Sequence, residues 1–179
     1  MYYHTIVITM HAFIKAPLPF ADRQMLKSAD EACQICLSSA HEISCLIEIQ
    51  QETWGADPAP VANAHWVTIA LCILMEDLTT AESHGAFMKL CKAHVHPAKR
   101  WLLPRGMMRM IQLTAQRMEG GSSLPEDVVA HFRDFERQHW GPEQARMFSS
   151  RYPNFTVAVR RRENVGVLED LELDVFLQK

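Results

Sequence analysis

Residues 29–47 read ADEACQICLSSAHEISCLI, and this stretch predicts the architecture of the chain more clearly than any other. Its small and apolar side chains recur in alternating steps of four and three residues, which places them on one face of an α-helix. They are Ala29, Cys33, Cys36, Ala40, Ile43 and Ile47. The pattern predicts a helix over residues 22–52, roughly eight turns long. Because small side chains dominate this seam, we expect a neighbouring helix to approach it closely.

Helical patterns also account for the flanking segments. Apolar residues three and four apart predict a buried helix over residues 2–14, which Pro17 and Pro19 should end. Its apolar set is Tyr3, Ile6, Val7, Met10, Phe13 and Ile14. A loop over residues 53–60 should follow the long helix. The next predicted helix, residues 61–78, is apolar nearly all round and should lie at the centre of the fold.

Three more helices are predicted beyond this central one. The first covers residues 81–94, and Pro97 suits the first turn of the second, which should run to Met118 with a kink at Pro104. Ser123-Leu124-Pro125-Glu126 is typical of a capping box, with Pro125 in the first turn of the third helix. That helix carries an apolar stripe and should end at Gly141-Pro142. The stripe consists of Val128, Phe132, Phe135 and His139.

The predicted fold class is therefore all-α, an irregular bundle of about six helices. Residues 1–150 form the helical domain, and residues 151–179 form a C-terminal tail that is either disordered or contains a short β element. Alternation at 155–159 and 171–177 is compatible with a short strand in either segment. The apolar run at the very start has no polar lead-in, so we expect the domain to be incomplete at its N-terminus.

Composition excludes several classes of protein. The chain has 179 residues, a formal net charge of −3 and 48% hydrophobic residues, which fits one soluble globular domain without a global basic field for nucleic acid. The opening apolar run is too short to span a bilayer and lacks the basic start of a signal peptide. Five scattered cysteines favour reduced thiols over a disulfide framework.

Cys33 and Cys36 have the spacing of half a zinc site or of a redox pair. No second CxxC or HxxxH pair completes a zinc site, and both cysteines lie on the apolar seam. Buried cysteine packs as a small hydrophobe, so packing is the favoured interpretation.

Two further groups of residues could carry chemistry. His94 and His96, with His84 upstream and Glu82 folding back, could form a metal site only if the chain were extended there. His41 and Cys45, four residues apart, face each other on a helix, but no glycine-rich turn supplies an oxyanion site. We therefore assign no catalytic, cofactor-binding or metal-ligating residue and predict no cofactor.

The tail offers two interaction motifs, each with a plainer alternative. Arg160-Arg161-Arg162 is either a weak nuclear import patch or a solvated turn. Residues 168–177 interleave four acids with large apolar side chains, a composition that suits acidic-hydrophobic activation segments. An edge strand or terminal helix of the domain would have the same composition.

The order of the predicted elements resembles the regulatory (middle-homology) domain of fungal zinc-cluster transcription factors. Tyr2-Tyr3-His4-Thr5-Ile6-Val7-Ile8-Thr9-Met10-His11 resembles a helix of that domain, which a proline-bearing loop, here 16–19, follows. The long helix with its small-residue seam and the very apolar helix from Trp66 to Leu78 complete the match over about residues 1–118.

The departures from the family pattern limit what the resemblance implies. His11-Ala12-Phe13-Ile14 stands where the family has His-Arg-Pro-Phe, and the six-cysteine DNA-binding zinc cluster is absent. No DNA-binding or zinc-binding residue of the family transfers to this chain. The resemblance implies a nuclear or nucleocytoplasmic regulatory domain that does not itself bind DNA.

Its partners would be transcriptional co-regulators, a small-molecule effector, or further copies of the chain that associate through exposed helix faces. Membranes are not among the expected partners. The alternatives are a small helical enzyme that uses His and Cys, and a helical interaction scaffold without a role in transcription.

Overall fold

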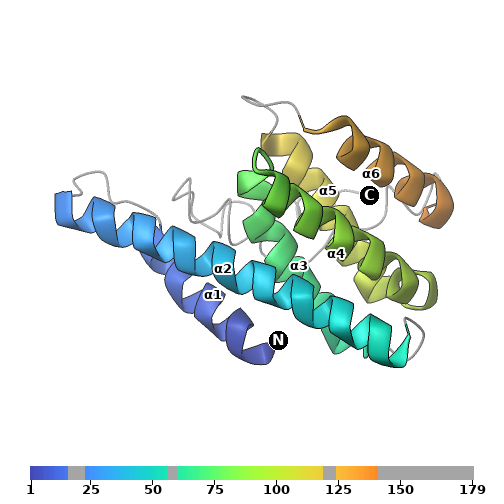
Figure 1. The fold of residues 1–179 in the computed structure, drawn as a ribbon. Coiled ribbons are helices and arrows are strands. Elements are labelled where there is room, and N and C mark those ends of the chain that lie inside the picture. Colours follow the sequence, from blue (N-terminus) through green and yellow to red (C-terminus); the bar gives the residue numbers. More distant parts are fainter. Residues whose placement is uncertain (16–22, 56–59, 119–123, 141–179) are drawn as a thin grey trace, which may run out of the picture.

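The computed structural model describes residues 1–15, 23–55, 60–118 and 124–140. Every regular element among these residues is helical, which confirms the all-α prediction (Figure 1). The elements are α1 (Tyr2–Lys15), α2 (Arg23–Trp54), α3 (Ala62–Leu74), the 3₁₀ turn η1 (Met75–Asp77), α4 (Ala81–Arg100), α5 (Leu102–Met118) and α6 (Glu126–His139). None of the helices in this described part is long and apolar enough to cross a membrane.

Helix α2 is the longest element, and its seam is buried as predicted. Cys36, Ala40 and Ile43 are completely inaccessible to solvent, and Ile47 is nearly so. Cys33 is only half-buried, because Ala32 lies closer to the centre of the contact face. Helix α1 packs along α2, and α3 and α4 cover other parts of it (Figure 1).

Helix α3 lies at the centre of the array, also as predicted, in contact with α1, α2, α4 and α5. Its buried apolar side chains point to several sides, which explains why its sequence shows so little amphipathic pattern. They are Ala64, Val67, Ala70, Leu71, Ile73 and Leu74. Helix α6 packs on the far side of α4, where Phe132 meets Phe87 edge to face with ring centroids 6.3 Å apart.

The predicted first helix is present as α1, but the prediction that its apolar face is buried is wrong. Thr5 and Ile8 are its buried residues, whereas most of the large apolar side chains face solvent. Periodicity identifies an apolar stripe on a helix but not the side on which the rest of the molecule lies. Thr5 tolerates burial because its hydroxyl donates a hydrogen bond to the carbonyl of Met1, at 3.2 Å.

The prediction for Pro97 and Pro104 is also corrected. Pro97 lies inside the last turn of α4, and the chain breaks at Trp101, whose backbone is extended (φ −126°, ψ 136°). Pro104 therefore falls in the first turn of α5, not in the middle of a longer helix. An N–H group there has no intrahelical partner in any case, so proline costs no hydrogen bond and no kink is required.

The structure also differs from the capping-box prediction. Pro125 precedes α6 instead of lying in its first turn, and it makes no side-chain cap. Ser123 and Gly141-Pro142 lie outside the described residues, as do the segments 155–159, 160–162 and 168–177. The predicted apolar stripe of α6 is buried throughout, which confirms it. Helix α2 runs to Trp54, two residues into the predicted loop, and ends at Gly55, whose φ of +79° favours glycine.

We expect Cys36→Asp to be far more destabilising than Cys36→Ala. The Cys36 side chain is inaccessible to solvent, and its sulfur lies 3.8 Å from the Ile8 carbonyl oxygen. A carboxylate at this position would therefore be covered by α1 and could not be hydrated. Burying an unpaired carboxylate costs several kcal/mol, whereas the small apolar replacement costs about 1 kcal/mol. Chemical denaturation of the variants measures both free energies of unfolding.

Cys45→Asp is the matched control, because Cys45 lies on the same helix but is exposed. It should change stability by no more than about 0.5 kcal/mol. Equal midpoints for Cys36→Asp and Cys45→Asp would show that the contact between α1 and α2 is misplaced.

Candidate functional site

Cys33 and Cys36 occupy different environments, although both belong to the seam of α2. Cys36 is fully buried, and burial raises the pKa of its thiol, an effect that the charge of Lys15 partly offsets. Cys33 is half-buried, and both cysteines are free thiols. Among the described residues, no group of three His, Cys, Asp or Glu side chains is placed to hold a metal ion.

His94 and His96 both lie in α4, and His94 has a structural role. Its Nε2 lies 2.7 Å from the carbonyl oxygen of Pro104, so the imidazole donates a hydrogen bond that ties α4 to α5. Burial lowers the pKa of His94 to about 4, although the bond to Pro104 opposes this shift. The ring is therefore neutral at neutral pH, and its Nδ1 has no hydrogen-bond partner among the described residues.

His41 contacts Ser83 and not Cys45, the residue that sequence spacing paired with it. His41 Nε2 lies 3.2 Å from Ser83 Oγ, and the Ser83 hydroxyl donates to Asp77 at 2.9 Å. In a catalytic pair the serine hydroxyl donates its hydrogen bond to the histidine that will accept its proton, whereas here it donates to the Asp77 carboxylate. Ser83 is also only 2% exposed, so this cluster closes the N-terminus of α4 and does not form a reactive site.

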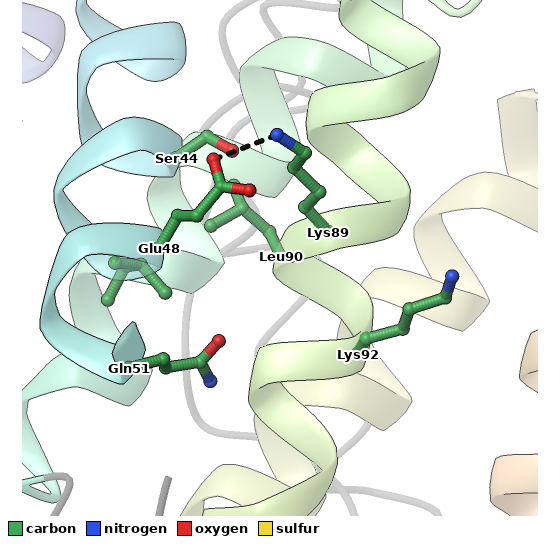
Figure 2. Close-up of a pocket in the computed structure, with 7 residues that line it drawn as sticks. Ser44, Glu48, Gln51, Lys89, Leu90 and Lys92 are labelled. Atoms are coloured by element: carbon green, nitrogen blue, oxygen red, sulfur yellow. Dashed lines mark hydrogen bonds and ion pairs between the residues drawn. The ribbon is translucent and has the colours of Figure 1, made fainter. Parts of the chain in front are cut away.

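A pocket of about 170 Å³ lies between α2 and α4 (Figure 2). Its polar edge is the ion pair between Lys89 Nζ and Glu48 Oε2, at 2.8 Å, and this hydrogen bond raises the pKa of Lys89. The lining residues are Ser44, Ile47, Glu48, Gln51, Lys89, Leu90 and Lys92. Pockets for small-molecule ligands usually occupy about 300–1,000 Å³, so this one is too small for an effector of ordinary size.

Carboxylates neutralise several of the basic side chains in the described helices. Lys15 pairs with Glu76, Arg109 with Glu136, and Arg137 with Asp134, in addition to the Lys89 pair in the pocket. Lys15 and Glu76 are both largely buried, which fixes the end of α1 against η1. These cations stabilise contacts between or within helices and do not form a free basic stripe.

The outward face of α1 exposes a row of large apolar side chains, which we call the α1 stripe. It consists of Tyr2, Tyr3, Ile6, Met10, Phe13 and Ile14. Each of these side chains is between 42% and 71% exposed. Sequence reasoning found most of these residues but expected them to be buried, with a segment beyond the N-terminus as a partner, since nothing in the spacing distinguishes a stripe that faces the molecule from one that faces away.

Comparison with known proteins finds a fungal transcriptional activator. The chain is similar to the notoamide biosynthesis transcriptional activator notL' of Aspergillus versicolor, with 30% identity over 143 residues. The match covers 75% of this chain and 23% of the activator, so the chain spans about a quarter of the length of this relative. No family model matches the sequence, and no solved structure matches it. The expected kinship with fungal transcription factors is thus supported, while the assignment to the zinc-cluster regulatory domain stays a prediction.

We expect acidification to destabilise the fold through His94. Its pKa is about 4 in the folded chain against an ordinary value of 6.5, so between these values the unfolded chain binds a proton that the folded chain does not. The contribution of neutral His94 is fully present above pH 6.5 and falls toward pH 4, by up to about 1.4 kcal/mol per pH unit. Free energies of unfolding measured across this interval give the slope.

His94→Gln keeps a donor for the Pro104 carbonyl but cannot take up a proton, so its slope should be shallower than that of the native chain. His131→Gln is the matched control, because burial lowers the pKa of this α6 histidine too, assisted by the charge of Lys92, but it is only half-buried. The control should retain most of the slope. A slope for His94→Gln equal to the native slope would contradict the role of His94.

Proposed function

We propose that this chain is a regulatory domain of a fungal-type transcription factor, which acts through protein contacts and does not itself bind DNA. The observation that carries the proposal is the 30% identity to a transcriptional activator across three quarters of the chain. The all-helical architecture agrees with the resemblance of its sequence to the middle-homology region of zinc-cluster factors. A nuclear location follows from the same proposal.

The electrostatics of the described helices favour protein partners over DNA. Proteins bind DNA phosphates through Lys and Arg side chains, which displace the counterions of the DNA. DNA-binding proteins therefore carry a basic face. Here the net charge is −3, and the cations of Lys15, Lys89, Arg109 and Arg137 already pair with carboxylates. Lys15 and Arg109, the least exposed of these cations, could contact phosphate only after they lose their carboxylate partners.

Enzymatic function is the weaker alternative because several of the side chains that could react are buried, although Cys45 is exposed. Cys36, Cys91 and His94 are buried, and burial raises the pKa of both thiols, which keeps them protonated and unreactive. The small volume of the α2–α4 pocket likewise favours protein contacts over effector binding at that place. A scaffold without a role in transcription would share this fold, so a transcriptional assay must separate the two.

The first test tethers the chain to a heterologous DNA-binding domain upstream of a reporter with basal activity in fungal cells. The proposal expects reporter output to change, in either direction, relative to the DNA-binding domain alone. Cys45→Asp should retain the effect, and Cys36→Asp should lose it, since only the second replaces a buried residue. Unchanged output with a stably expressed chain would leave the scaffold as the better interpretation.

The second test measures DNA binding by the purified chain through fluorescence anisotropy. We expect no preference for any duplex over its scrambled version. Residual non-specific binding should weaken steeply between about 50 and 200 mM salt, as counterion release requires. A salt-resistant preference for one sequence would show that the chain reads DNA directly, against the proposal.

A further inference from the structure

We propose that the α1 stripe is the interface through which two copies of this chain associate, with α1 of one copy packed against α1 of the other. The stripe points away from the α2 contact, because the buried residues Thr5 and Ile8 occupy the opposite side of the helix. Figure 1 shows α1 at the outer edge of the helical array, where no other described helix covers its outward side.

The spacing of the stripe fits another helix as its occupant. Tyr3, Ile6, Met10 and Phe13 are separated by steps of three, four and three residues, the spacing of positions a and d in a coiled coil. The sequence keeps this pattern over two repeats within the 14 residues of α1. Side chains at such positions pack into the spaces between side chains of a facing helix, which gives the partner its shape.

The area of the stripe is close to what a dimer needs. Aromatic side chains bury about 150–250 Å² each, so Tyr2, Tyr3 and Phe13, which are 66–71% exposed, together offer roughly 300–500 Å². Ile6, Met10 and Ile14 are 42–64% exposed and extend the same surface. The sum approaches the roughly 800 Å² that each partner buries in an interface of standard size. It lies at or above the roughly 300–600 Å² of the largest apolar patch on a typical monomer.

The absence of charge on this face allows a second copy to pack against it. Flanking positions of a helical seam normally carry Glu and Lys, which select the partner by attraction and repulsion. In α1 the positions next to the seam are Tyr2, Val7, Thr9 and Ile14, none of them acidic or basic. Two identical faces therefore meet without like-charge repulsion. When a two-fold axis relates the two copies, the same surface is used on both, so association stops at the dimer.

Sedimentation velocity over a range of concentrations tests the proposal on the full chain. The native chain should show a monomer–dimer equilibrium, and the double variant Ile6→Gln with Met10→Gln should raise the dimer dissociation constant at least about tenfold. Both side chains are exposed in the described structure, so the circular dichroism and thermal midpoint of the variant should stay near the native values. The matched control is Ile49→Gln, an exposed isoleucine on α2 outside the stripe, which should leave the equilibrium unchanged.

Three outcomes would overturn the proposal. A native chain that stays monomeric at high concentration would show that no second copy binds. A dimer that the double variant leaves intact would place the interface on another face. A monomer that the double variant unfolds would mean that other residues of the same chain cover the stripe. Because none of these readouts involves transcription, the inference stands or falls separately from the proposed function.

Discussion

The contact between α1 and the seam of α2 is the interaction on which the rest of this structure depends. Small residues at Cys36 and Ala40 let the neighbouring backbone approach closely, and Ile43 and Ile47 continue the same face toward the later helices. A helix of 32 residues gains its stability chiefly from such packing, since propensity alone rarely holds a helix of mixed composition together. With α2 fixed, α3 can lie across it with apolar side chains on nearly every side, and α4 to α6 follow by packing on α3 and α4.

A second constraint sets the orientation of α1 on that seam. Lys15 pairs with Glu76 of η1 in a largely buried position, while Ile8 and Thr5 meet the packed side. Removing one member of such a pair leaves an uncompensated charge away from water, so the register of α1 is specified more strictly than apolar contact alone would specify it. The consequence is that the apolar stripe, from Tyr3 to Phe13, has to face outward.

Sequence reasoning predicted the parts of the fold that periodicity determines. The α2 seam, the central α3 and the α6 stripe all follow from apolar residues at helical spacing, and each is buried as expected. It failed where the answer depends on contacts between elements. Nothing local distinguishes a stripe that faces a partner from one that faces the core, and the extended backbone at Trp101, which places Pro104 at the start of α5, depends on how α4 and α5 meet. The contacts of the candidate site could not be predicted from the sequence either. His41 contacts Ser83, and His94 donates a hydrogen bond to the Pro104 carbonyl, only when separate segments come together in the fold.

The distribution of chemistry between interior and surface bears directly on function. In the described helices, Cys36, Cys91 and His94 are buried, and burial favours the neutral form of each. The side chains of the α1 stripe, which could bind by surface contact, are exposed. An arrangement of this kind suits a protein whose output is an association equilibrium. Affinity then depends on the apolar area that two partners remove from water, and a modest change in that area or in concentration shifts the population of the complex. Under the function proposed above, control of assembly would regulate such a domain without a ligand cavity or catalysis.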